Sequence, residues 1–146
     1  PVDRVRPFWD WVQAQAGAGI IKIPWEVHDE FTGDGLHVQW INDPDVKAAL
    51  ILDEEVNPEL VQRVINDGYQ GTDAAFDDIE HTKYGKDPFL AAYALVDPNN
   101  RTVVTRERSK RTQRLGSTKL PDACDDLGVK WVDDFQLYRE LNFTVS

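Results

Sequence analysis

The stretch DPFLAAYALVDPNNRTVVT, residues 87–105, decides the fold class. Its first half predicts the most apolar helix of the chain, Phe89–Val96, which the pair Asp87-Pro88 starts. The letters DPNN that follow are typical of a turn, because Asp, Pro and Asn each favour turn geometry. Arg101–Thr105 then predicts a buried strand around its two valines. A helix joined by a short turn to a strand indicates an α/β arrangement.

The alternation continues toward the C-terminus. After a basic segment, Leu120-Pro121 leads a predicted helix that runs to Leu127. Gly128 ends this helix, because glycine is preferred at the position just past a helix terminus. A strand at Val129–Val132 and a closing helix at Phe135–Leu141 complete the pattern.

The N-terminal half contains more helix and weaker strand signals. Ile20–Ile23 is a short β-branched run, and Val46–Leu52 fits either a helix or a short strand. Because strands alternate with helices and no linker or repeat interrupts them, residues 1–146 predict one α/β domain with a mainly parallel sheet. The further predicted helices are Arg4–Gln15, Pro24–Phe31 and a helix from Asn57-Pro58 to about Asp67.

Length, charge and cysteine content exclude several classes of protein. A chain of 146 residues is large enough to bury a core of its own. Its net charge of −10 argues against a simple DNA coat or a basic membrane-surface protein. The single cysteine, Cys124, excludes an intramolecular disulfide framework and favours a reducing compartment, the cytoplasm. No apolar run approaches the roughly 18 residues that span a bilayer, so no membrane association is expected.

The charge is unevenly distributed along the chain. Residues 101–119 contain seven basic side chains and one acidic side chain, Glu107, which gives this segment a net charge of +6. Such a run is most often a solvated loop, but it can also be a surface that binds a polyanion. If it binds RNA, the residues expected to steer the substrate are Arg106, Arg108, Lys110 and Arg111.

Acidic residues are placed close to the ends of the predicted strands, where open parallel sheets bind ligands. Strand 20–23 leads into a helix that carries Glu26 and Glu30 on one face, and Glu107 follows strand 101–105. Asp87 begins a helix. Neighbouring carboxylates repel unless a divalent cation neutralises them, and all-oxygen clusters suit Mg²⁺ or Mn²⁺. Such a site can activate water for attack on a phosphodiester.

Each acid also has a structural explanation. Asp87 before Pro88 is a good helix N-cap, and Glu26 and Glu30 complement the positive end of a helix dipole. Glu107 can be one anion in a cationic loop. Other chemistries lack motifs, because the three histidines form no zinc pattern and the chain has neither a P-loop nor a nucleophile elbow.

Four segments, in this order, resemble the PIN-domain superfamily of metal-dependent ribonucleases, and within it a PIN-like bacterial subfamily. The last of the four is the most specific to the subfamily, and the resemblance covers most of the chain from about Phe8 onward. The segments are IPWEVHDEF (23–31), GKDPFLAAYALV (85–96), TVVTRERS (102–109) and KLPDACDDLGVKWVDDFQLYRELNF (119–143).

The resemblance implies roles for individual residues. Glu30 matches the family's second acidic position, Asp87 the third, and Glu107 the acid after the late strand. Glu26 matches an acid common in the subfamily, and Thr105 matches a recurrent hydroxyl residue that orients a ligand or water. A catalytic set of Glu30, Asp87, Glu107 and Thr105 is thus implied, with Glu26 as a further metal ligand.

The resemblance also implies a fold and an activity. The fold is a PIN-like three-layer α/β structure with a mainly parallel central sheet flanked by helices. The activity is that of an endoribonuclease with one or two Mg²⁺ or Mn²⁺ ions, as in the toxins of toxin–antitoxin pairs. An antitoxin protein and a second copy of the chain in a homodimer are the implied protein partners.

One departure from the family pattern concerns the N-terminus. The family opens with an apolar strand that ends in an Asp, and nothing before Arg4 matches that strand. We expect the missing strand and its Asp upstream of Pro1, in which case this chain alone is inactive. The alternatives are a PIN-like interaction module that does not cleave, and an acidic mimic of nucleic acid, which the basic segment 101–119 disfavours.

Overall fold

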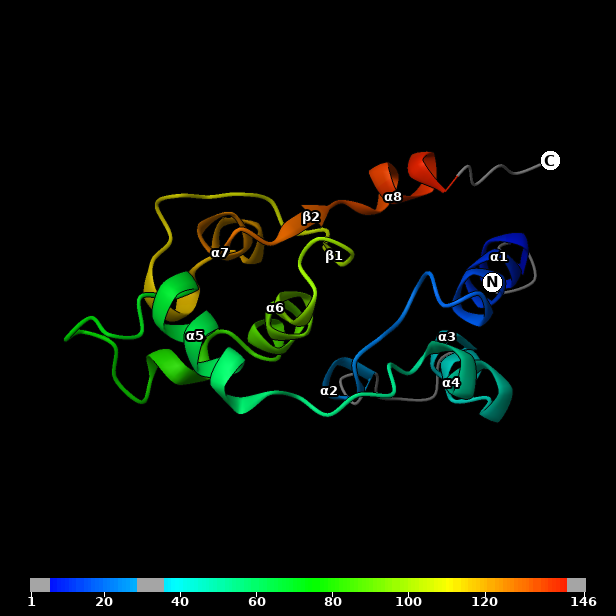
Figure 1. The fold of residues 1–146 in the computed structure, drawn as a ribbon, viewed down its shortest axis with the longest axis horizontal. Coiled ribbons are helices and arrows are strands. Elements are labelled where there is room, and N and C mark those ends of the chain that lie inside the picture. The colour runs from blue at the N-terminus through cyan, green and yellow to red at the C-terminus, as the bar shows by residue number, and fades with distance from the viewer. Residues whose placement is uncertain (1–5, 29–35, 142–146) are drawn as a thin grey trace. The chain divides into compact units, whose positions relative to one another are not determined.

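The computed structural model describes residues 6–28 and 36–141 of the chain. The chain divides into two compact units, one within residues 1–54 and the other within residues 55–142. Figure 1 labels the helices and strands of both units. Within the described ranges, no helix is both long enough and apolar enough to cross a membrane.

The first unit consists of short helices around a small core. Its core side chains are Ala16, Ile41, Val46 and Leu50. The helices are α1 (Arg6–Gly17), α2 (Trp25–His28), α3 (Leu36–Ile41) and α4 (Pro44–Leu50). The helix predicted at Pro24–Phe31 is therefore seen as α2, and its last residues lie outside the described range.

The ambiguous segment Val46–Leu52 is mostly helical, with an extended end. Asp43 caps α4, because its Oδ1 accepts hydrogen bonds from the backbone N–H groups of Asp45 at 3.0 Å and Val46 at 3.3 Å. After the helix, Ile51 forms a parallel bridge with Ile23. The predicted strand Ile20–Ile23 is thus reduced to this single bridge in the described structure.

The second unit begins with the helix that the Asn57-Pro58 pair predicts. α5 (Pro58–Gly68) is capped by Asn57, whose Oδ1 accepts from the N–H groups of Glu59 at 3.0 Å and Leu60 at 3.3 Å. A 3₁₀ turn, η2 (Glu80–Thr82), and α6 (Asp87–Val96) follow. Both predicted helices are confirmed to within two residues.

A parallel strand pair lies beside these helices. β1 (Thr102–Val104) pairs with β2 (Lys130–Val132), and Val103 lies opposite Trp131. Between the strands, the chain passes through the basic loop, the 3₁₀ turn η3 (Leu115–Ser117) and α7 (Leu120–Leu127). The helix α8 (Asp134–Glu140) follows β2. The expectation of a mixed α/β fold with parallel pairing is confirmed.

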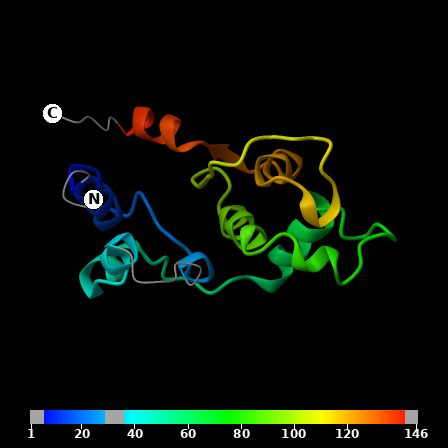
Figure 2. The same ribbon diagram turned by 180° about the vertical axis from the view of Figure 1, so that it is seen from behind.

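The core of the second unit joins α5, α6 and α7 to the strands. These three helices pack against one another, and Figures 1 and 2 show them grouped beside the strand pair. Gly128 ends α7 with a φ of 72°, the left-handed conformation that glycine adopts without strain. The core side chains are Val64, Tyr69, Ala91, Ala92, Ala94, Val103, Leu120, Ala123, Cys124, Leu127 and Val129.

Candidate functional site

A pocket of about 270 Å³ lies in the second unit and is lined by two of the acids that the sequence singles out. Asp87 reaches it from the first turn of α6, and Glu107 from the loop that follows β1. These acids are twenty positions apart in the chain, and the fold brings them to one pocket. The other residues that line it are Lys83, Tyr84, Gln113, Gly116, Ser117, Thr118 and Lys119.

Glu107 is held in place from both sides. Its Oε2 accepts a hydrogen bond of 2.8 Å from the backbone N–H of Leu120, at the positive N-terminal end of α7. Its own N–H donates to Thr105 Oγ1 at 3.1 Å, and Thr105 N–H donates to Val132 O at 3.0 Å. Thr105 therefore positions the backbone of Glu107, while within the described residues Glu107 Oε1 makes no hydrogen bond or ion pair.

Asp87 is not the N-cap of its helix. It is the first residue of α6, and Lys86 occupies the N-cap position without a side-chain hydrogen bond. The Asp87 side chain is half-buried beside Tyr84, which lines the same pocket. The N-cap position, which the sequence offers as the structural explanation of Asp87, is thus occupied by Lys86.

Tyr69 adds a hydroxyl that the sequence does not single out. Its side chain is fully buried, and its hydroxyl has no hydrogen-bond partner among the residues that the structure describes. Burial raises the Tyr69 pKa well above its usual value, and the nearby charges of Asp87 and Glu107 raise it further. The ring packs edge-on against Tyr84 at 5.7 Å between centroids. An unpartnered buried hydroxyl costs free energy.

The residues of the pocket suit a hard divalent cation that keeps most of its water. Mg²⁺ commonly takes one or two protein carboxylates and fills its other positions with water or phosphate oxygens, and Asp87 and Glu107 supply that number. Within residues 6–28 and 36–141, no three His, Cys, Asp or Glu side chains lie together so as to hold a metal ion. The donor set described is therefore a pair of carboxylates, with the Tyr69 hydroxyl nearby.

Two lysines give the same pocket a positive side. Lys83 Nζ forms an ion pair with Glu80 Oε1 at 2.8 Å, whereas Lys119 makes no ion pair within the described residues. The backbone of Gly116 lies so close to that of Glu80 that no side chain could be placed on it. A pocket with carboxylates and an available ammonium group can hold a cation and an anion together, as a metal-bound phosphate requires.

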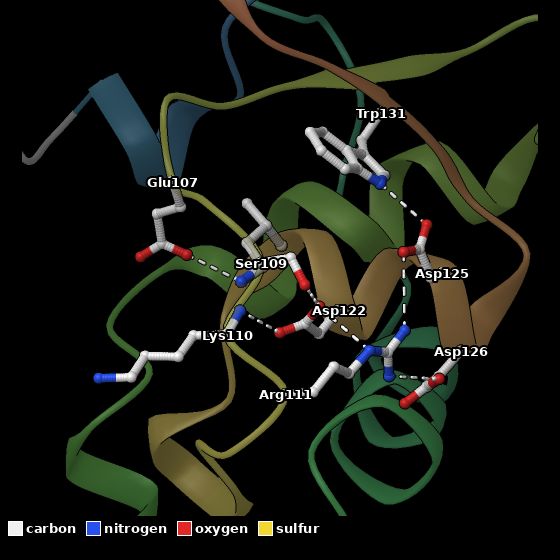
Figure 3. Close-up of polar contacts among 9 residues, drawn as sticks. Glu107, Ser109, Lys110, Arg111, Asp122, Asp125, Asp126 and Trp131 are labelled. Carbon is white, nitrogen blue, oxygen red and sulfur yellow. Dashed lines mark hydrogen bonds and ion pairs between the residues drawn. The ribbon is translucent and has the colours of Figure 1, made fainter.

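A second acidic site lies next to this pocket and is centred on Asp122, a residue to which the sequence assigns no role. Asp122 is only 2% exposed. It accepts hydrogen bonds from Ser109 Oγ and from the N–H of Lys110 at 2.9 Å, and pairs with Arg111 Nε at 3.2 Å. Figure 3 shows these contacts between the basic loop and the first turn of α7. Asp122 thus fastens the loop to the helix.

Arg111 is engaged by three carboxylates of α7. Besides Asp122, its guanidinium pairs with Asp126 at 3.0 Å and with Asp125 at 3.6 Å. The hydrogen bond to Asp126 and the charges of these acids raise the Arg111 pKa further above its already high value. In Figure 3, Arg111 turns toward these acids, whereas the Lys110 side chain extends away from them. The side-chain charge of Arg111 is therefore engaged within the protein, whereas among the described residues that of Lys110 is not.

The other predicted RNA-steering residues are exposed. Arg106 pairs with Asp134 at 3.3 Å, while its side chain stays 80% exposed. The side chains of Arg108 and Lys110 form no ion pair within the described part of the chain. Three of the four predicted cations thus remain accessible to a polyanion.

Two predicted acids belong to the N-terminal half. Glu26 lies in α2 of the first unit and is half-buried, and Glu30 lies outside the described residues. The pocket of the second unit is therefore described with Asp87 and Glu107 alone.

Comparison with known proteins places the chain in a family. No curated protein matches this chain, and no solved structure matches it. A family model described as "Domain of unknown function (DUF4411)" matches residues 1–145, which is nearly the whole chain. The chain therefore belongs to the DUF4411 family.

Proposed function

We propose that this protein is a metal-dependent RNA endonuclease with a PIN-like three-layer fold, acting in the cytoplasm. The observation that carries the proposal is the meeting of Asp87 and Glu107 in one pocket. The four resembling segments supply the family context, and in that context Glu30 and Glu26 complete the acidic set. The antitoxin partner and the homodimer implied by the same resemblance are part of the proposal.

Each residue of the pocket has its own role in this proposal. Asp87 and Glu107 would hold Mg²⁺ or Mn²⁺, and Thr105 keeps Glu107 in position through its backbone. The cation, when bound, polarises a phosphodiester and makes water a better nucleophile. Lys119 would attract the phosphate electrostatically, because this lysine lines the pocket and has no ion-pair partner in the described residues.

The basic loop extends this pocket toward a longer polyanion. Arg106, Arg108 and Lys110 expose their charged groups, so they can neutralise RNA phosphates next to the cleaved bond. Arg111 contributes indirectly, because its contacts to α7 hold the loop in place. Binding through such contacts weakens as salt concentration rises, since RNA releases its counterions when protein cations replace them.

RNA cleavage by the full-length protein tests the proposal. Cleavage should require Mg²⁺ or Mn²⁺ and stop with EDTA, and Asp87→Asn and Glu107→Gln should each slow it by about 100-fold or more, because each removes a metal ligand. Asp67→Asn is the matched control, since Asp67 is an exposed acid of α5 paired only with Arg63. Cleavage that survives both EDTA and Asp87→Asn would rule the proposal out.

The alternative is a PIN-like interaction module that does not cleave. Lys119 favours it, because this lysine lines the same pocket, makes no ion pair in the described residues and can balance part of the charge of the two acids without a metal. Calorimetric titration with Mn²⁺ separates the two cases. Heat of binding that disappears in Glu107→Gln supports the nuclease, whereas no heat at millimolar Mn²⁺ supports the interaction module.

A further inference from the structure

A second pocket, of about 280 Å³, shares Glu107 with the first. The two pockets therefore meet at Glu107, the residue that we place next to the cleaved phosphodiester. The second pocket lies entirely in the second unit, between the loop after β1 and the segment from β2 into α8. Its lining residues are Arg106, Glu107, Arg108, Ser109, Trp131, Asp133, Asp134 and Phe135.

Two aromatic side chains distinguish this pocket from the first. Phe135 is 63% exposed, although a large apolar side chain gains free energy from burial. Trp131 is half-buried, and its indole N–H donates to Asp125 Oδ1 at 2.8 Å, as Figure 3 shows. That hydrogen bond limits the rotation of the indole. A fixed ring and an exposed ring that line one pocket are a surface on which a flat ring can stack.

Two arginines lie beside the aromatic rings. Arg106 forms an exposed ion pair with Asp134, and an exposed pair of this kind contributes at most about 1 kcal/mol. Its guanidinium can therefore exchange Asp134 for a phosphate at little cost. Arg108 is exposed and makes no ion pair within the described residues. The pocket thus combines stacking surfaces with groups that bind phosphate.

We propose that this second pocket binds one unpaired nucleobase of a single-stranded nucleic acid. The base stacks on Phe135 and Trp131, and the adjoining phosphate lies against Arg106 or Arg108. Duplexes are excluded because their bases are already stacked and paired inside the helix, whereas single strands offer their bases to aromatic side chains. The inference rests on the proposed nuclease function, and it adds that the substrate is single-stranded at the base next to the cleaved bond.

Binding in EDTA tests this pocket without cleavage. Fluorescence anisotropy of labelled oligonucleotides should give tighter binding of single-stranded RNA than of duplex RNA to the full chain. Phe135→Ala should weaken single-strand binding by about 5-fold to 100-fold, the range for loss of one base stack. Ile79→Ala is the matched control, because Ile79 is a 65% exposed apolar residue of the same unit that lines neither pocket. It should bind like the wild type.

A second pair of variants separates stacking from charge. Arg106→Ala should weaken binding and reduce the slope of log affinity against log salt concentration by about 1, the share of one phosphate contact. Arg63→Ala on α5 should change neither. Single-stranded DNA of the same sequence serves as a further arm. Equal binding of RNA and DNA assigns the pocket to the base and phosphate that both share, and tighter binding of RNA adds a contact to the 2′-hydroxyl.

The outcomes distinguish this inference from the proposed function. Equal affinity for duplex and single strand, or wild-type affinity of Phe135→Ala, overturns the base pocket even if the protein cleaves RNA. A large loss in Phe135→Ala with no cleavage under any metal condition supports the base pocket and rejects the nuclease.

Discussion

Glu107 and Asp122 are two acids at one junction, where the loop after β1 meets the first turn of α7, and the protein surrounds them differently. Glu107 belongs to the loop and accepts one hydrogen bond from the helix, at Leu120 N–H. Asp122 belongs to the helix and accepts hydrogen bonds from Ser109 and Lys110 of the loop. Glu107 is exposed at two pockets, whereas Asp122 is buried and also paired with Arg111.

The difference separates a structural carboxylate from one that can bind a ligand. Protein donors occupy the oxygens of Asp122, so this carboxylate holds the loop against α7. Glu107 keeps Oε1 without a hydrogen bond in the described structure, and it lines two pockets. We infer that the buried acid positions the exposed one, because Asp122 holds Ser109, Lys110 and Arg111, which follow Glu107 directly in the loop.

The largest effect should come from removing the structural acid. Asp122→Ala removes two hydrogen bonds to a buried charge and should lower the free energy of unfolding of the second unit by about 3 kcal/mol or more. Glu107→Ala should cost about 1 kcal/mol, because it removes one half-buried hydrogen bond at the N-terminus of α7. Native-state hydrogen exchange of the α7 amides measures both in the same unit.

Asp126→Ala is the control for that comparison. Asp126 pairs with the same Arg111 but is 41% exposed, so its loss should change stability by no more than about 1 kcal/mol. Equal costs for Asp122→Ala and Glu107→Ala would contradict the division into a structural and a ligand-binding carboxylate.

Removing the Ser109 hydroxyl beside Asp122 and removing the Tyr69 hydroxyl in the core should affect the free energy of unfolding differently. Ser109→Ala deletes a donor to the buried Asp122 and should cost about 1.5–3 kcal/mol. Tyr69→Phe deletes a hydroxyl that has no partner, and should leave stability unchanged or raise it by about 1 kcal/mol. Hydrogen exchange of the second unit again provides the measurement.

Tyr84→Phe is the matched tyrosine variant. Its hydroxyl hydrogen-bonds with His81 Nδ1 at 3.0 Å, so removing it should cost about 1 kcal/mol. If Tyr69→Phe proves as costly as Ser109→Ala, the Tyr69 hydroxyl has a partner in solution and is not available to the pocket.

The sequence predicts elements well where the signal is local. Asn57-Pro58 and Gly128 mark helix ends by their own side-chain or backbone chemistry, and both lie at helix ends in the structure. The segment after residue 45 is ambiguous by periodicity, because its apolar residues fit both periods. The Asp43-Pro44 cap makes it helical, and Ile51 then pairs with Ile23.

The residues of the candidate site divide in the same way, into those that a local sequence signal marks and those that depend on distant contacts. Asp87 and Glu107 can be named in advance because each lies at an element end that the sequence marks. The roles of Asp122 and Tyr69 cannot, because they depend on contacts between segments far apart in the chain. Asp122 looks like one more surface acid in a helix of acids, and Tyr69 like an ordinary core aromatic. Only the packing of α7 against the loop and of α5 against α6 gives them their surroundings.

The smallest expected effect is on the pH dependence of stability, which compares the buried Cys124 and Tyr69 with the ion pairs around Asp122. Burial raises the pKa of Cys124 from its ordinary value of 9.0 to about 12, with smaller contributions from Asp125 and Asp87. Burial also raises the pKa of Tyr69. The folded protein therefore keeps protons that the unfolded chain releases, so the stability these groups give is complete below about pH 9 and declines as pH rises further. The Asp122 region should not contribute, because the pKa of Arg111 lies above this window.

The thiol alone should lower the free energy of unfolding by about 1.4 kcal/mol at pH 10, one pH unit above its unfolded pKa. Urea unfolding followed by circular dichroism between about pH 8 and pH 10 measures this slope. Cys124→Ala should flatten the slope whatever it costs at neutral pH, since a baseline loss does not change with pH. Arg111→Gln should leave the slope unchanged. A slope that follows Arg111→Gln instead would place the alkaline sensitivity in the Asp122 region, and would mean that its ion pairs, rather than the groups buried in the core, limit stability there.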